Sequence, residues 1–177
     1  MLDGTGRDCL KRRCTAPEPS VLEGSRRQAA DQSSLDQYRH DDYGNDGITS
    51  LMELHREIGW RCHELQHARF EEGSEHFFAY CFEEVTGRTI LHGELVSMGV
   101  LIMSSLTGHQ PEVARSIVAD AGTRHRPEEL GITWEEIDAT LTALPAFATE
   151  GGYWFSYAQT LEVNEQTFLT ARAALDF

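Results

Sequence analysis

Two histidines, His76 and His92, are the residues of this sequence with the clearest capacity for chemistry. Each stands at the expected start of a helix, in the runs Gly-Ser-Glu-His76 and Leu-His92-Gly-Glu. They are 16 residues apart, so a helix and a short turn could bring both imidazoles into one cleft. Neutral imidazole binds Zn²⁺ and other divalent ions. The spacing is compatible with a metal site, but from the residues alone a hydrogen-bonded structural role is the preferred interpretation, because a histidine at a helix end more often has that role.

Two glutamates lie beside these histidines in the sequence. Glu75 directly precedes His76, and Glu94 follows His92 by two positions. A carboxylate that accepts a hydrogen bond from a ligand imidazole fixes the tautomer and the orientation of the ring. Both glutamates are candidates for this role, and both could equally be solvated charges near a helix N-terminus.

A further histidine pattern, His63-Glu-Leu-Gln-His67, matches the H-E-x-x-H motif of zinc peptidases. That motif needs both histidines on one face of a helix, one turn apart. The face expected to be buried here carries Ile58, Cys62 and Leu65, and the histidines fall beside it. We therefore prefer a solvated helix end, with a peptidase as the alternative.

Helical periodicity accounts for the chain from about residue 47 onward. Apolar residues recur at three- and four-residue steps from Ile48 to Leu65, and Ser74 is the expected N-cap of a second helix that ends at Gly87. The nearly all-apolar run over residues 91–106 predicts a central helix. Gly93 and Gly99 within it predict the close approach of a neighbouring helix or a ligand.

Capping signals predict three more helices. They cover residues 111–120, the segment from the Thr133 capping box to Pro145, and the segment from Asn164 to Leu175. Only residues 153–157 show a weak strand pattern. We predict an all-α helical bundle over residues 47–177, preceded by an irregular leader over residues 1–46 that is rich in Gly, Ser, Arg, Asp and Gln.

Composition excludes some classes of binding partner and some cellular locations. Among 177 residues, 15 Lys and Arg stand against 29 Asp and Glu, which gives a net charge of −14 and argues against nucleic acid as a partner. The four cysteines form no C-x-x-C pair. No apolar run is long enough for a membrane span or a signal segment, so we expect no membrane association and a cytoplasmic location.

The two histidine runs also carry a family resemblance. Arg69-Phe-Glu-Glu-Gly-Ser-Glu-His76, followed by Leu91-His-Gly-Glu-Leu-Val-Ser-Met-Gly99, resembles the metal-binding helical domain of the iron-containing alcohol dehydrogenase, glycerol dehydrogenase and dehydroquinate synthase superfamily. The Gly-Ser-Glu-His form looks most like sn-glycerol-1-phosphate dehydrogenases. The resemblance covers roughly residues 47–177. It implies that His76 and His92 are ligands of Zn²⁺ or Fe²⁺ in an all-α C-terminal domain.

The resemblance further implies reversible hydride transfer between a nicotinamide and a polyol phosphate or similar alcohol. In this superfamily the helical domain packs against a Rossmann-like domain that binds NAD(P). No strand and Gly-rich phosphate loop appears here, so we assign no cofactor-binding residue and no catalytic residue. The family's third metal ligand, an upstream acidic residue, is also unassigned. We expect a truncated or split gene whose product pairs with a separate cofactor-binding chain or associates with itself.

A substrate phosphate has two candidate contacts. One is Arg69, and the other is the cluster Arg124-His125-Arg126, for which a solvated loop is the preferred interpretation. Two other functions stay open beside the dehydrogenase. They are a carbocycle-forming lyase of the dehydroquinate synthase type and a non-catalytic remnant or interaction module.

Overall fold

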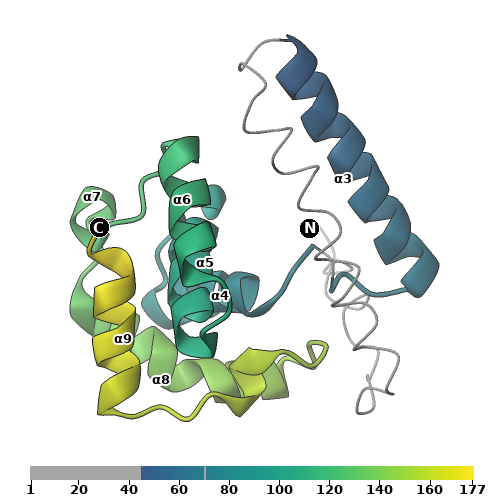
Figure 1. Cartoon of the computed structure of the whole chain (residues 1–177). Coiled ribbons are helices and arrows are strands. Elements are labelled where there is room, and N and C mark those ends of the chain that lie inside the picture. Colours follow the sequence, from purple (N-terminus) through teal and green to yellow (C-terminus); the bar gives the residue numbers. More distant parts are fainter. Residues whose placement is uncertain (1–44, 70) are drawn as a thin grey trace, which may run out of the picture. The chain divides into compact units, whose positions relative to one another are not determined.

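All regular structure in the described part of the chain is helical, as predicted. The computed structural model describes residues 45–69 and 71–177 (Figure 1). The α-helices are α3 (Asn45–Leu65), α4 (Ser74–Thr86), α5 (His92–Thr107), α6 (Pro111–Ala121), α7 (Pro127–Leu130), α8 (Trp134–Glu150) and α9 (Glu165–Leu175), with a 3-10 helix η2 (Tyr157–Thr160) before the last. The weak strand pattern at residues 153–157 forms no strand, since this segment is irregular and leads into η2.

The chain divides into two compact units, which are described separately. Among the described residues, one contains α3 and the residues up to Glu71, and the other contains Glu72–Phe177 with the remaining described helices. The predicted leader, residues 1–46, lies outside the described residues except for Asn45 and Asp46, which begin α3. The expected burial of the α3 face is wrong for Leu65, which is 51% exposed.

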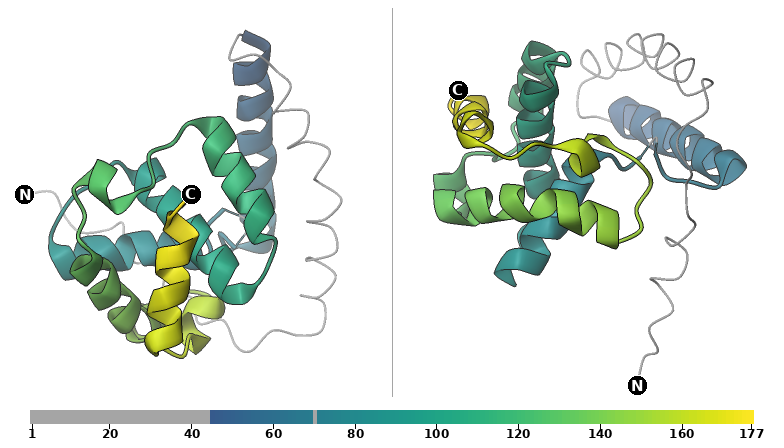
Figure 2. Two further views of the ribbon diagram at one scale, coloured as in Figure 1. Left: turned by 60° about the vertical axis from the view of Figure 1, so that its left-hand side comes forward. Right: turned by 90° about the horizontal axis from the view of Figure 1, so that it is seen from below.

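The core of the larger unit is built on α4 and α5. These two helices pack on each other, while α8 covers α4 and α9 covers α5, and Figure 2 shows them from two further sides. Helix α5 buries seven of its sixteen residues and packs against both α4 and α9, which agrees with its prediction as the central helix. The largest fully buried side chains include Phe77, Phe78, Phe82, Leu95, Met98, Ile102, Ile137, Leu141 and Leu144. No described helix has both the length and the apolar composition of a membrane span.

Most helix ends follow the predicted signals. Gly87 ends α4 and Gly108 ends α5, both in the left-handed region with φ of 65° and 68°. Thr133 caps α8 by accepting a hydrogen bond from the backbone N–H of Glu136 at 3.2 Å. Asn164 caps α9 in the same way, by accepting from the N–H groups of Gln166 and Thr167.

Two predicted helix ends are wrong for tertiary reasons. Gly73 takes the N-cap position of α4, and the hydroxyl of Ser74 instead accepts a hydrogen bond from the backbone N–H of Ala158, 84 residues away, at 3.1 Å. Pro145 does not end its helix, because α8 continues to Glu150 and fully buries Ala148 beyond the proline. In both places packing outweighs a local preference.

Burial should make Cys81 an unreactive thiol. It is 0% exposed on α4, and its Sγ donates to the carbonyl oxygen of Thr140 at 3.6 Å. Burial, with the nearby charge of Glu84 in second place, raises the pKa of Cys81 to about 12. Since the thiolate is the nucleophile, we expect iodoacetamide at a pH of about 8 to leave Cys81 unmodified in the folded protein and to alkylate it in denaturant. Peptide mass spectrometry checks this, and equal labelling in both states would contradict it.

Candidate functional site

The structure brings the rings of His76 and His92 together. His76 lies in the first turn of α4, and His92 is the first residue of α5. Their ring centroids are 5.4 Å apart, and the ring planes meet at 49°. The side chain of His76 is 18% exposed and His92 is exposed, so solvent reaches both imidazoles.

Gly99 allows α5 to approach the backbone of α4 beside this pair. A Cβ atom built on Gly99 would lie 2.5 Å from the carbonyl oxygen of Glu75 and 3.0 Å from its Cα. Only a residue without a side chain fits there, as predicted from the glycine within the helix. No helix approaches Gly93 in this way, because nothing among the described residues lies within 4 Å of a Cβ built there, and the alternative of a ligand beside Gly93 stays a prediction.

Glu75 orients the ring of His76. Its Oε1 accepts hydrogen bonds from the backbone N–H of Gly73 at 2.7 Å and from Nδ1 of His76 at 3.0 Å. Burial raises the pKa of Glu75, but the hydrogen bonds from His76, from its own N–H and from Gly73 outweigh burial and lower the pKa below its ordinary value. An ionised carboxylate only accepts, so Nδ1 of His76 carries the proton and Nε2 of the neutral ring keeps its lone pair for a ligand.

Glu94 is engaged elsewhere. Its Oε1 accepts from Nε of Arg124 at 2.6 Å, and its Oε2 accepts from Nη2 of Arg124 at 3.0 Å. A guanidinium group can donate to both oxygens of a carboxylate at once. Both oxygens of the buried Glu94 are therefore hydrogen-bonded to Arg124. In the part of the chain that the structure describes, Glu94 forms no hydrogen bond to either imidazole, so of the two candidate glutamates Glu75 is the one that contacts a histidine ring.

The other arginine of the predicted phosphate cluster is also hydrogen-bonded within the protein. Arg126 donates to the main-chain carbonyl oxygen of Phe177, and His125 stacks on the Phe177 ring at a centroid distance of 4.6 Å. These contacts join the loop before α7 to the segment after α9. Arg124 and Arg126 are nevertheless exposed, as the solvated-loop interpretation expects, and the contact of this cluster with a substrate phosphate stays a prediction.

The histidines of the H-E-x-x-H match do not share a helical face. Helix α3 ends at Leu65, and Gln66 has a left-handed φ of 56°. His63 is therefore helical while His67 lies beyond the end of the helix, so the geometry of a zinc peptidase is absent from this motif. Arg69, in the same unit, donates its backbone N–H to Nδ1 of His67 at 3.3 Å. Its proposed contact with a substrate phosphate stays a prediction.

Tyr80 belongs to the site, although the sequence analysis did not single it out. It lies one turn after His76 on α4, and its ring stacks on His92 with a centroid distance of 5.7 Å and an interplanar angle of 20°. Its hydroxyl donates to Oε1 of Glu72 at 3.1 Å. The only available signal was the four-residue spacing from His76, which places both side chains on one face of the helix.

The histidine pair fits two of the ligands of a divalent metal ion. At a Zn–N distance of about 2.1 Å, two imidazoles in tetrahedral coordination have ring centroids roughly 5 Å apart. The observed 5.4 Å agrees with this spacing. Among the described residues, no group of three or more His, Cys, Asp or Glu is arranged to hold a metal ion. The pair would therefore need at least one ligand from outside these residues.

Comparison with curated proteins finds relatives named glycerol-1-phosphate dehydrogenase (NAD(P)+). The relative from Saccharolobus solfataricus is 34% identical over 96 residues, which are 54% of this chain and 27% of the relative. The relative from Thermofilum pendens is 36% identical over 94 residues, 52% of this chain and 26% of the relative. The relative from Aeropyrum pernix is 34% identical over 70 residues, 40% of this chain and 20% of the relative.

These matches span about a quarter of the length of the curated relatives. No protein-family model matches the chain, and no solved structure matches it. Over about half of its length the chain is similar to glycerol-1-phosphate dehydrogenases, which supports the superfamily that its two histidine motifs resemble.

Proposed function

We propose that this chain is the metal-binding helical part of an NAD(P)-dependent dehydrogenase that acts on a polyol phosphate or a similar alcohol. One observation carries the proposal. Two helix starts place the rings of His76 and His92 5.4 Å apart, in a chain similar to dehydrogenases whose names include both glycerol-1-phosphate and NAD(P)+.

His76 and His92 would hold the metal ion, Zn²⁺ or Fe²⁺, through ring nitrogens. Such an ion acts as a Lewis acid that polarises an alcohol or carbonyl oxygen. Glu75 keeps the Nδ1 proton of His76 and leaves Nε2 as the donor atom. His92 is exposed, so the pair is open to a small substrate.

The redox partner of the reaction is a nicotinamide. Oxidation of the alcohol moves a hydride from its carbon to NAD(P)+ and releases the hydroxyl proton, and reduction of the carbonyl reverses both transfers. We place the dinucleotide-binding domain outside the described residues, either in the same polypeptide or in a partner chain. The remaining metal ligand would come from that domain as well.

Metal binding by the full chain tests the proposal. Zinc affinity, measured by competition with a chromophoric chelator, should fall in His76→Ala and in His92→Ala, because each variant removes a ligand atom. The loss should be at least the 10- to 100-fold typical of changes to residues that only support a ligand. His109→Ala, at an exposed position after α5, is the matched control and should bind zinc as the parent does.

Equal zinc affinity in all variants, or no zinc binding by the parent, would overturn the metal site.

Enzyme assays separate the candidate functions from one another. Oxidation of NADH with dihydroxyacetone phosphate, with or without an added cofactor-binding domain, supports the dehydrogenase. Phosphate release from a heptulosonate phosphate would indicate a synthase instead. Zinc-free, inactive protein would indicate an interaction module.

A further inference from the structure

The two imidazoles of the site are held by different means. His76 is fixed by its hydrogen bond to Glu75. His92 is exposed at the first position of α5, and no hydrogen bond to its ring nitrogens occurs within the described residues. Its orientation therefore depends on the rings around it.

Tyr80 is the ring that lies most nearly parallel to His92. The two planes differ by 20° at a centroid distance of 5.7 Å, within the range of offset-stacked aromatic pairs. Tyr153 also lies nearly parallel to Tyr80, at 19° and 6.4 Å. His76 contacts Tyr80 from the same helix at 6.2 Å. Tyr80 thus has ring contacts with both histidines.

The hydroxyl end of Tyr80 is anchored as well. It donates to the carboxylate of Glu72 at 3.1 Å, a residue that directly precedes the cap of α4. The backbone of Glu72 is itself held, because its carbonyl oxygen accepts from Nε1 of the buried Trp154 at 2.9 Å. A hydrogen bond at one end and stacking along the face leave Tyr80 little freedom to turn.

We propose that Tyr80 is a positioning residue, which orients the His92 ring for metal binding through this stack and is held in place by Glu72. The inference rests on the proposed function, since it concerns the same metal site. Tyr80 itself contacts no metal in this scheme. Its effect is preorganisation, because a ring that is already oriented loses less freedom when it binds an ion.

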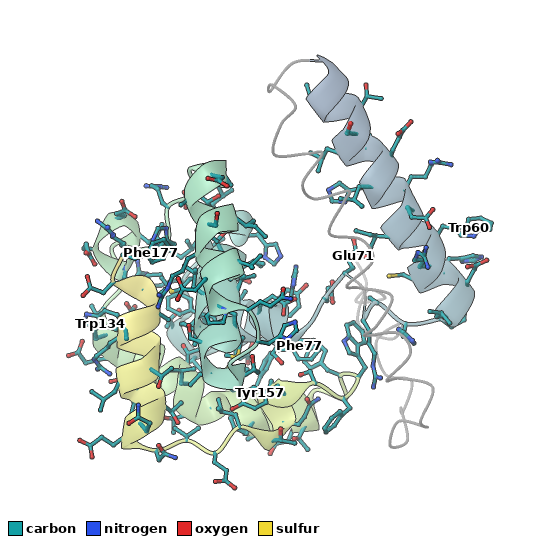
Figure 3. All side chains as sticks on the ribbon, viewed as in Figure 1. Trp60, Glu71, Phe77, Trp134, Tyr157 and Phe177 are labelled. Atoms are coloured by element: carbon teal, nitrogen blue, oxygen red, sulfur yellow. The ribbon has the colours of Figure 1, made fainter. Side chains whose placement is uncertain are left out.

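Three variants of the full chain test the Tyr80–His92 stack and the Tyr80–Glu72 hydrogen bond separately. Tyr80→Leu removes the ring, and Tyr80→Phe keeps the ring and removes the hydroxyl. Glu72→Gln removes the negative charge of the group that accepts the hydrogen bond from the hydroxyl. Tyr157→Leu is the matched control, because Tyr157 is half-buried on η2 (labelled in Figure 3) and is in no ring contact with either histidine.

The first readout needs no metal. In the NMR spectrum of the metal-free protein, the ring protons of His92 should carry a ring-current shift from Tyr80. That shift should vanish in Tyr80→Leu and survive in Tyr80→Phe and Tyr157→Leu. Because this shift depends on the distance and angle between the two rings, its loss in folded Tyr80→Leu reports the loss of the stack, and zinc affinity reports what the stack does for metal binding.

The second readout is zinc affinity. We expect about a 10-fold or larger loss in Tyr80→Leu, comparable to other residues that support a ligand. We expect about a 2- to 10-fold loss in Tyr80→Phe and Glu72→Gln, the range of one hydrogen bond. If Tyr80→Leu does not fold, these two variants decide the matter, and unchanged affinity in both would overturn the proposal.

The two readouts also distinguish the possible failures. A parent protein that binds no zinc overturns the proposed function and this inference together. A parent that binds zinc, with a Tyr80→Leu variant that is folded and binds equally well, overturns the role of Tyr80 and leaves the metal site standing.

Discussion

Replacing Gly99 with alanine should destabilise the helical unit by about 3 kcal/mol, at the upper end of the usual cost of overpacking. The added Cβ would lie 2.5 Å from the carbonyl oxygen of Glu75, and backbone atoms cannot move aside as a flexible side chain could. Helices α4 and α5 would have to separate next to the two histidines. Urea denaturation followed by circular dichroism measures the loss of stability.

Gly93→Ala is the matched control for this substitution. It lies on the same helix, and a Cβ there meets nothing within 4 Å among the described residues. Its free energy of unfolding should stay the same or rise by up to about 1 kcal/mol, since alanine is the better helix former. Equal stabilities for the two variants would contradict the close approach at Gly99.

Replacing Phe77 with alanine should cost about 3 to 5 kcal/mol, the range for removing a buried phenylalanine. Phe77 is 0% exposed on α4 (labelled in Figure 3). Its ring packs against Tyr153 at a centroid distance of 4.6 Å and against Trp154 at 5.6 Å. The truncation leaves a cavity directly behind the turn that carries His76.

Phe155→Ala provides the comparison for Phe77. This phenylalanine directly follows Trp154 in the segment between α8 and η2 but is 47% exposed, so its removal should change stability by no more than about 0.5 kcal/mol. Tryptophan fluorescence during urea denaturation reports both variants. A small effect of Phe77→Ala would show that this part of the core repacks around the missing ring.

Local signals made much of the fold predictable. A run of apolar residues that ends at Gly108 predicts helix α5, and Asn164 as an N-cap predicts the start of α9. Thr133 and Glu136 form the capping box that their spacing indicates. These features depend on residues within about one turn of each other, so sequence alone contains the whole interaction.

The features that sequence missed depend on distant partners. Ser74 accepts from a backbone group 84 residues away, and Glu94 pairs with an arginine 30 residues away. Neither partner is visible in a local sequence pattern. The sequence therefore predicted Ser74 as a helix cap and Glu94 as a hydrogen-bond partner of an imidazole. The histidine pair was accessible to sequence analysis because one helix and its turn separate the two residues.

The carboxylate of Glu75 performs two tasks through one oxygen atom. Oε1 accepts one hydrogen bond from the backbone N–H of Gly73, at the start of α4, and another from Nδ1 of His76. The beginning of the helix and the tautomer of the ring are consequently coupled, and neither can be tuned by mutation at this position without altering the other. A redesign of the proposed metal site would therefore keep Glu75 and vary the side chain of His92, which is not hydrogen-bonded to this oxygen atom.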